Sequence, residues 1–582
     1  NISYRIPSGD IKYNSPEHIS MIKHAAAESE RLGLQFGVHN CDGWSASGGP
    51  WIGPEQSMKM VVYSETIVKG GKKTSLELPM PTVREGYYED IAVVAYPSLQ
   101  SELSDASNQP KITSSDKELN VSVLNDGKVD STTTIHGSKK EPATILYEYP
   151  QAFSLKSLLV WTGTRNSEFK FYVSEDGQDF TELDAPYNRR PGKTEYCLSR
   201  IYDDINTKYI KVETTAEVKI FELNFFSTQL IEDQLGRVSL SKTNASSVKP
   251  IGTPDKNMII DKSTIIDLSA DMDASGKLKT KLPKGNWTIM RFGYTSTSAQ
   301  NNPATDSGRG LEVDKYHKAS VKVHYDAFTK EVVKASMPVA PNAMQFVEID
   351  SYEMGGQNWT FDYDRIFTGR FDYNLIPFLP LYAGRFVESA DASEAVTYDI
   401  KKLNSELMVE NYFGYFTELS HQDGIKTYIE PYGNGPMDDL ATGGKADIPM
   451  DEFWTTHPID DNRVPPTITS SAVTSAHLYG KNIVSAESFT APSKLNWKGH
   501  PATNKKSGDR IWTLGINEFM FHRFAHQANT HVVPGMTMGP WGSHFDRTNT
   551  WWYNAGKAWF KYMARGQYLL RQGIPVYDFL VF

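Results

Sequence analysis

The sequence predicts an α/β fold combined with all-β regions, and two patterns along the chain indicate it. After about residue 344, short apolar runs alternate with helical stretches, and this order predicts a parallel sheet. Between about 58 and 340, short alternating stretches are separated by Gly, Asn, Asp and Pro turns, which is typical of β-strands. We therefore expect a (β/α)8 barrel of the TIM type that is interrupted by inserted β-sandwich domains.

The first element expected is a helix over residues 14–33. Asn14 or Ser15 can cap its start, Pro16 suits its first turn, and Gly33 follows its end. These residues mark both ends of the predicted helix.

A short apolar strand follows this helix, with the sequence LQFGVHN, and it ends in His39 and Asn40. After it comes a loop, CDGWSASGGPW, that is too polar and too rich in glycine to belong to a core. Because the loop directly follows a strand end, Asp42 and Trp44 become candidates for a binding site.

A complete β-module is expected within residues 110–226. The stretch LNDGKVDSTT, which holds an Asp126-Gly127 turn, is followed by the runs SLLVWTG, FKFYVSEDGQDFTEL, KYIKVET and VKIFELNFF. This order resembles the discoidin, or coagulation factor 5/8 type C, β-sandwich. Such sandwiches are frequent carbohydrate-binding appendages, although a purely structural role is the alternative. The turn from Asp126 to Asp130 could separately hold a structural ion.

The remaining strand-like runs are MQFVEIDSYE, IKTYIEPYG, ADIPMDEFW, NIVSAESFT and THVVPGM. Helical stretches such as TYDIKKLNSELMVENYFGYFTELSHQDG and TLGINEFMFHRFAHQAN lie between them. Counting LQFGVH, six strands are predicted, whereas a closed barrel needs eight. We therefore expect two strand–helix units upstream of Asn1, and further β domains downstream of Phe582.

At 582 residues the chain is too long for one ordinary domain. We expect the start of the (β/α)8 barrel over 1–57, a β-rich connection over 58–109, the discoidin-like β-sandwich over 110–228, a second β-rich inserted region over 229–340, and the remainder of the barrel over 341–582.

Composition excludes several classes of function. The net charge of −10 argues against a nucleic-acid surface, and no apolar run is long enough to span a membrane. The two cysteines, Cys41 and Cys197, make neither a disulfide framework nor a Cys-rich zinc site. A nucleotide-dependent transferase is a weak alternative, because no GxGxxG or GxxxxGK(S/T) stands at a strand–helix turn.

Acidic residues stand at the C-terminal tips of four predicted strands, where a barrel builds its active site. They are Asp350 and Glu353 in EIDSYE, Glu430 in YIEPYG, Asp451 and Glu452 in IPMDEFW, and Glu487 in SAESF. Glycosidic bond cleavage ordinarily needs two carboxyl groups: one protonates the leaving oxygen, and the other activates water or attacks directly. With LQFGVH as the third strand, Glu353 and Glu487 follow strands four and seven, which face each other. For any single such residue, binding to a helix N-terminus or to an Arg is the alternative.

Seven segments resemble the glycoside hydrolase family 106 of α-L-rhamnosidases. They are RLGLQFGVHNCDGWSASGGPWIGPEQSM, GNWTIMRFGYT, GLEVDK, DSYEMGGQNWT, PMDEFW, SAESFT and PGMTMGPWGSHFDRTNTWW, in this order across most of the chain. That family consists of inverting, calcium-dependent enzymes that remove α-linked L-rhamnose. The resemblance therefore implies such a hydrolase, with calcium as cofactor and a glycan bearing terminal rhamnose, such as a pectic polysaccharide, as substrate. It also implies an extracytoplasmic location, in the bacterial periplasm or at the cell surface.

The same resemblance implies a role for each carboxyl group. Glu353 would be the general acid, Glu487 the general base that activates water, and Asp350 a residue that tunes or orients Glu353. Burial or a neighbouring carboxylate, Asp350 or Glu430, should raise the pKa of the acid. In an inverting enzyme the two working carboxyls should lie about 6.5–9.5 Å apart.

Calcium favours oxygen ligands, so Glu430, Asn40 and Asp42 are candidate ligands. Rhamnose carries a methyl group, which calls for an apolar contact beside groups that bind hydroxyls. The full set of predicted substrate contacts is His39, Asn40, Trp44, Trp359, Glu430, Glu452, Trp454, Trp541, His544 and Arg547. Four further histidines show no metal-ligand spacing, and we interpret them as ordinary core or surface residues: His421, His457, His477 and His522.

Two other functions fit parts of the pattern. A retaining β-glycosidase of galactosidase type would use Glu487 as nucleophile, with the carboxyls about 5–5.5 Å apart. A carbohydrate-binding protein without catalysis would suit the discoidin-like insert, but Glu353 and Glu487 argue against it.

Overall fold

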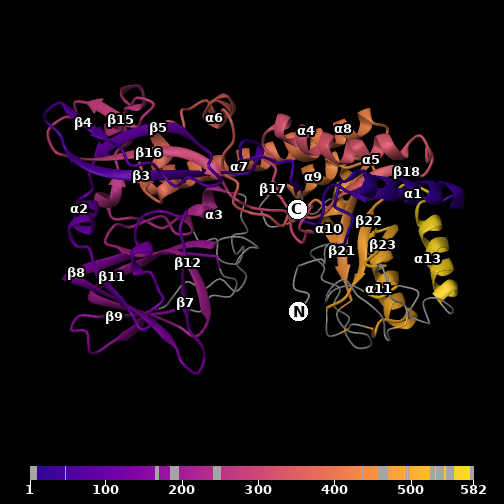
Figure 1. Cartoon of the computed structure of the whole chain (residues 1–582), viewed down its shortest axis with the longest axis horizontal. Helices are drawn as coiled ribbons and strands as arrows, with labels where there is room; N and C mark the ends of the chain where they lie inside the picture. The colour runs from indigo at the N-terminus through magenta and orange to yellow at the C-terminus, as the bar shows by residue number, and fades with distance from the viewer. Residues whose placement is uncertain are drawn as a thin grey trace.

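The computed structural model describes residues 9–45, 47–163, 169–183, 196–239, 251–433, 437–455, 469–492, 495, 497–524, 531, 543–545 and 556–576, and for 196–204 and 469–470 it describes the backbone alone. The β-rich part lies at one end of the molecule and the α/β part at the other (Figure 1). Among the described helices, none is long and apolar enough to cross a bilayer.

A six-stranded parallel sheet forms the centre of the α/β part, and its strands are neighbours in chain order. The strands are β1 (Phe36–His39), β18 (Met344–Ile349), β20 (Lys426–Ile429), β21 (Ile448–Trp454), β22 (Ser485–Thr490) and β23 (Glu518–Phe521). The first five confirm the predicted strands from LQFGVH to NIVSAESFT. The closed eight-stranded barrel stays a prediction.

The sixth strand of the sheet lies in a stretch that was predicted to be a helix. The stretch TLGINEFMFHRFAHQAN was expected to be helical, but helix α11 (Pro501–Leu514) ends at Gly515, whose φ of 110° is open to glycine. Strand β23 then pairs in parallel with β22 and buries Phe519 in an aromatic core. Of the run THVVPGM, expected as the sixth strand, all but His531 lies outside the described residues.

The first helix, α1 (Pro16–Leu32), confirms its predicted ends. The Ser15 hydroxyl accepts a hydrogen bond from the backbone N–H of His18 at 3.2 Å, and Gly33 ends the helix with a φ of 67°. This helix packs against α5 (Thr329–Ser336), which follows α4 (Lys318–Ala327). Both α4 and α5 lie in the region 229–340 that was predicted to be β-rich, and α5 also contacts β18.

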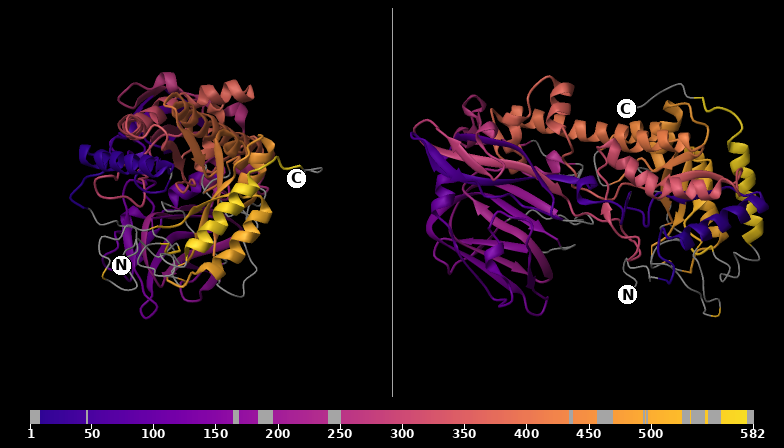
Figure 2. Two further views of the ribbon diagram at one scale, coloured as in Figure 1. Left: turned by 90° about the vertical axis from the view of Figure 1, so that its right-hand side faces the viewer. Right: turned by 45° about the horizontal axis from the view of Figure 1, so that its top comes forward.

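A long helical rod confirms the predicted helix at TYDIKKLNSELMVENYFGYFTELSHQDG. It consists of α7 (Ala390–Leu407), the π-helical segment η8 (Met408–Gly414) and α8 (Tyr415–Gln422). The rod runs from the β-rich part toward the parallel sheet, as the right-hand view of Figure 2 shows. The other helices of the α/β part are α9 (Asp439–Lys445), α10 (Thr469–Leu478) and α13 (Gly556–Leu570).

Two larger sheets form most of the β-rich part. One is a four-stranded sheet in the order β14 (Ile266–Asp267), β5 (Tyr88–Pro97), β16 (Asn286–Ser296) and β3 (Lys59–Lys69). The other is a seven-stranded antiparallel sheet with its own apolar core, made of β6 (Lys111–Ser114), β7 (Thr133–His136), β8 (Ala143–Thr162), β9 (Phe169–Ser174), β10 (Thr181–Leu183), β11 (Tyr196–Thr214) and β12 (Glu217–Phe226). Its likeness to a discoidin sandwich and its predicted ion stay predictions.

Candidate active site

Carboxylates from three strand ends meet at the carboxyl edge of the parallel sheet. One oxygen from each of Asp350, Glu430 and Glu487 lies within 4.8 Å of the others. Three strand spacings separate β18 from β22, so a flat sheet would hold their perpendicular side chains about 14 Å apart. The sheet therefore curls, and it brings the predicted fourth and seventh strands face to face.

Glu430 is the most deeply buried member of this carboxylate cluster. Its Oε2 accepts hydrogen bonds from the Ser351 backbone N–H at 3.1 Å and from the Tyr432 hydroxyl at 2.7 Å. Its Oε1 is buried and finds no hydrogen-bond donor among the described residues. Burial, followed by the negative charges of Asp350 and Glu487, raises the pKa of Glu430 well above its usual value. A buried carboxylate oxygen without a donor fits a site that receives a cation.

Glu487 lies on β22, and Glu452 of β21 pairs with it in the parallel register. Burial, followed by the charges of Glu452 and Asp350, raises the pKa of Glu487 well above its usual value. The Thr490 hydroxyl donates to Glu487 Oε1, and His522 Nδ1 lies 3.3 Å from the same oxygen. His522 was interpreted from the sequence as an ordinary histidine, and the structure instead places it beside the predicted base.

Glu353 follows β18 and is joined to the loop after β1. Trp44 Nε1 donates a hydrogen bond of 2.9 Å to Glu353 Oε2, and the Glu353 backbone N–H donates to the Ser45 carbonyl at 3.2 Å. The Gly- and Trp-rich loop and the predicted acid, about 310 positions apart in the sequence, therefore meet in the fold. The indole N–H is aimed at one carboxylate oxygen and restricts how that group can turn.

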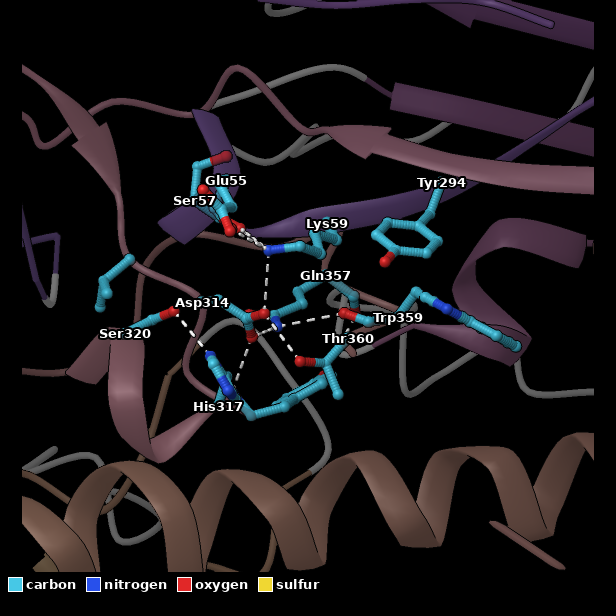
Figure 3. Close-up of polar contacts among 12 residues, drawn as sticks. Glu55, Ser57, Lys59, Tyr294, Asp314, His317, Ser320, Gln357, Trp359 and Thr360 are labelled. Carbon is cyan, nitrogen blue, oxygen red and sulfur yellow. Dashed lines mark hydrogen bonds and ion pairs between the residues drawn. The ribbon is translucent and has the colours of Figure 1, made fainter. Parts of the chain in front are cut away.

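A buried ion pair holds the chain that follows Glu353 (Figure 3). Lys59 Nζ lies 3.2 Å from Asp314 Oδ2, and both side chains are completely buried. Asp314 also accepts hydrogen bonds from Gln357 Nε2 at 2.5 Å and from the Thr360 hydroxyl at 2.7 Å. Both donors belong to the segment DSYEMGGQNWT, so the pair fixes the loop that carries the acid.

A second buried pair holds the loop that carries Trp44. Lys315 Nζ lies 2.8 Å from Glu312 Oε2, again with both side chains fully buried. Glu312 accepts from the Ser45 hydroxyl at 2.6 Å and from the Ser47 backbone N–H at 3.1 Å. The sequence signal for both pairs was the segment GLEVDK, in which charged residues alternate with apolar ones in a β-stretch.

Replacing Asp314 with Asn is expected to destabilise the protein by about 3–5 kcal/mol, because it leaves the buried Lys59 charge without its partner. Urea denaturation followed by tryptophan fluorescence measures the change. Glu28→Gln serves as the control, since it breaks the exposed Arg31–Glu28 pair on α1 and should leave stability nearly unchanged. Equal stabilities for the two variants would contradict the assigned role of the Lys59–Asp314 pair.

Of the predicted residues at and after the end of β1, His39 lies beside the carboxylates. His39 Nε2 is 3.3 Å from Glu348 Oε2 and 4.0 Å from Asp350 Oδ2. Asn40 is buried, and its Nδ2 donates to the Tyr412 hydroxyl at 3.0 Å. The Oδ2 of Asp42, the third calcium candidate, accepts from the backbone and hydroxyl of Thr305 at 2.9 and 2.6 Å. This contact gives Asp42 a loop-fixing role.

Trp359 was predicted to contact the sugar, but the structure buries it in the core. Its side chain is 2 % exposed and packs in the main core, with its ring centroid 4.7 Å from that of Tyr363. The rings of Tyr363, Tyr294 and Tyr382 surround the Trp359 side chain, so it is not open to a ligand. Asp451 likewise faces away from the cluster, since its Oδ2 accepts from the backbone N–H of Ala472 on α10 at 3.3 Å.

The other predicted contacts divide into two groups. Trp454 ends β21 and is half-buried, and the His544 ring stacks on Trp497 with centroids 3.8 Å apart. Trp541 and Arg547 lie outside the described residues. Their contacts with a sugar stay predictions.

Comparison with known proteins gives three findings. A family model described as glycoside hydrolase family 106, alpha-L-rhamnosidase, matches residues 3–582. A protein of Formosa agariphila named "Putative beta-glucuronidase" is 32 % identical over 583 residues, which cover 100 % of this chain and 38 % of that protein. The structure of a rhamnosidase from Novosphingobium sp. PP1Y superposes with a TM-score of 0.81 at 24 % identity, over 98 % of this chain and 55 % of that one. The chain thus spans well under two thirds of either relative.

Proposed function

The chain belongs to glycoside hydrolase family 106, the family of alpha-L-rhamnosidases, and from this premise we propose that the protein hydrolyses α-L-rhamnosides with inversion at the anomeric carbon. The observation that carries the proposal is the meeting of carboxylates from β18, β20 and β22 at one edge of a curled parallel sheet. Glu353, held by Trp44, lies just after the first of these strands.

In the proposed reaction Glu353 is the general acid and Glu487 is the general base. Glu353 transfers its proton to the glycosidic oxygen as the bond to the anomeric carbon breaks. Glu487 takes a proton from a water molecule whose oxygen forms the new bond on the opposite face of the sugar. The products are the alcohol of the leaving group and rhamnose of inverted configuration. Trp44 orients the acid, and Asp350 is proposed to tune or orient it as well. The charge of Asp350 also contributes to the raised pKa of Glu487.

Calcium fits the residues that are present. Asp350 and Glu430 offer hard carboxylate oxygens, and the buried Glu430 Oε1 has no donor among the described residues. These two residues would hold the ion, and Glu487 is left to act on water. A bound calcium ion would supply positive charge that offsets the mutual repulsion of the carboxylates. Asn40 stays a predicted further ligand.

EDTA is therefore expected to lower both the activity and the melting temperature, and added calcium should restore them. Glu430→Gln should weaken calcium binding, as isothermal titration calorimetry measures it, because one charged ligand is lost. Glu418→Gln, at an exposed position of α8 (Tyr415–Gln422), is the control and should bind calcium as the natural protein does. Unchanged calcium binding in Glu430→Gln would contradict the assigned site.

The charge of the site favours a neutral sugar over a uronic acid. Asp350, Glu430, Glu452 and Glu487 lie together, and their mutual charges contribute to the raised pKa values of Glu430 and Glu487. A glucuronide carboxylate would add a further negative charge to this cluster. The name of the Formosa relative, "Putative beta-glucuronidase", describes that protein. For this chain we propose a glucuronide only as the second candidate substrate, after an α-L-rhamnoside.

Parallel assays on the full-length protein test the proposal. We expect release of para-nitrophenol from the α-L-rhamnoside with calcium, and at least tenfold slower release from the β-D-glucuronide and the β-D-galactoside. Fastest release from either of the other two glycosides would overturn the proposed substrate. Rhamnoside binding without turnover would favour a carbohydrate-binding protein.

We further propose that the natural substrate is a rhamnose-bearing glycan such as a pectic polysaccharide. The protein would meet this glycan outside the cytoplasm, in the periplasm or at the cell surface.

A further inference from the structure

The last residue but one of strand β22 (Ser485–Thr490) has left-handed backbone geometry, two positions after the proposed base. Phe489 has a φ of 65°, a region that aromatic residues rarely adopt. In a regular strand, residues three apart point to opposite faces, so Glu487 and Thr490 would be separated. Here the Thr490 hydroxyl instead donates to Glu487 Oε1. The turn at Phe489 is what brings the two side chains to the same side.

The surroundings of Phe489 hold this turn in place. Its fully buried ring packs against Phe453 and Trp559, with centroids 4.8 and 5.4 Å away. Its carbonyl accepts a hydrogen bond from the Ser543 hydroxyl at 2.7 Å. Strained backbone that is over-determined by its surroundings concentrates at functional sites. The strained backbone at Phe489 therefore indicates a functional role for the contact between Thr490 and Glu487.

His522 completes a hydrogen-bonded chain to the base. Its backbone N–H donates to the Ser488 carbonyl at 3.0 Å, which docks the residue after β23 beside the end of β22. Its Nδ1 lies 3.1 Å from the Thr490 hydroxyl oxygen and 3.3 Å from Glu487 Oε1. The His522 side chain is 28 % exposed and that of Glu487 19 % exposed, so this contact lies at the site and not in the core behind it.

The proton positions in this chain follow from counting donors. A base acts in its ionised form, and ionised Glu487 can only accept. The single Thr490 proton points to Glu487, so the Thr490 oxygen must accept from His522. The Nδ1 atom of His522 therefore carries a proton, and its N–H is shared between Thr490 and Glu487.

We propose that His522 is a positioning residue for Glu487, which acts through its Nδ1–H, directly and by way of Thr490, to aim the ionised carboxylate at the attacking water. This inference deepens the proposed function and rests on it. In this role His522 acts on the reaction only through Glu487. It keeps one carboxylate oxygen occupied, which leaves the other oxygen of Glu487 for the water.

Two substitutions at His522 separate positioning from packing. Asn can place its amide N–H near the Nδ1 position, whereas Gln places it near Nε2. We expect His522→Gln to lower kcat about 10–100-fold with KM changed less than threefold, because a hydrogen bond to a charged group is lost. His522→Asn should recover most of kcat. Thr490→Val should reproduce the loss, and Thr490→Ser should restore the natural rate.

The outcomes distinguish this inference from the proposed function. Asn and Gln variants with equal kcat, at melting temperatures like that of the natural protein, would overturn the positioning role while rhamnoside hydrolysis stands. If the natural protein hydrolyses no glycoside, the proposed function fails. The tautomer then still reports on His522, since ¹⁵N-histidine NMR, assigned with the His522→Asn variant, should show a protonated Nδ1. A bare Nδ1 with a protonated Nε2 would overturn the inference.

Discussion

Replacing Glu487 with Gln is expected to lower kcat on an α-L-rhamnoside by about 10²–10⁴-fold, the usual contribution of a general base. Gln has nearly the same shape, and its amide can still contact Thr490 and His522, but it cannot take a proton from water. KM should change little, because the substitution removes an interaction that is made only in the transition state. Initial rates over a range of substrate concentrations measure both constants.

The control for this variant is Glu418→Gln, the same chemical change at an exposed position of α8. It should have the kcat and KM of the natural protein. The melting temperature of Glu487→Gln should not fall, because the change removes a negative charge from a crowded carboxylate cluster. Near-normal turnover by Glu487→Gln would end its assignment as the base.

The second large effect is expected for Glu353→Gln, and its size should depend on the leaving group. With a poor leaving group, such as a second sugar, kcat should fall about 10²–10⁴-fold, because no acid protonates the departing oxygen. With 2,4-dinitrophenyl α-L-rhamnoside the loss should be much smaller, since this leaving group departs without a proton. Comparing the two substrates in the natural protein and in the variant measures the effect.

Trp44→Phe is the matched variant for the acid, because it keeps the aromatic ring and removes the N–H that donates to Glu353. It should cause a smaller loss with the same dependence on the leaving group. A uniform loss on both substrates in Glu353→Gln would contradict the acid role and would indicate that Glu353 only binds the sugar.

The parallel strands could be predicted because each one is a short apolar run that ends in a polar residue. That pattern correctly located β18, β20, β21 and β22 and the carboxylates that follow them. Strand β23 was missed because no Gly or Pro separates EFMF from the HRFAHQAN that follows it, so the whole stretch was interpreted as one helix. Its pairing with β22 and the aromatic core around Phe519 decide the structure, and both depend on distant residues.

The strand-end carboxylates that lie together could be located from the sequence, whereas the residues that contact them could not. His522 carries no spacing signal, because its partners come from β22 through the turn at Phe489. The fully buried Lys59 and Lys315 were missed because lysine is usually exposed and each partner lies on another segment or three residues away. Trp359 was misassigned because a Trp after two glycines suggests a binding loop, whereas tertiary packing buries it.

The anomer that is formed first distinguishes inversion from retention at the anomeric carbon. The full-length protein is incubated with para-nitrophenyl α-L-rhamnoside, with calcium and then with EDTA, and proton NMR follows the product before it mutarotates. The proposed mechanism predicts calcium-dependent release of β-L-rhamnose, with Glu487 acting on water. First release of α-L-rhamnose would contradict inversion and would make Glu487 the nucleophile of a retaining enzyme.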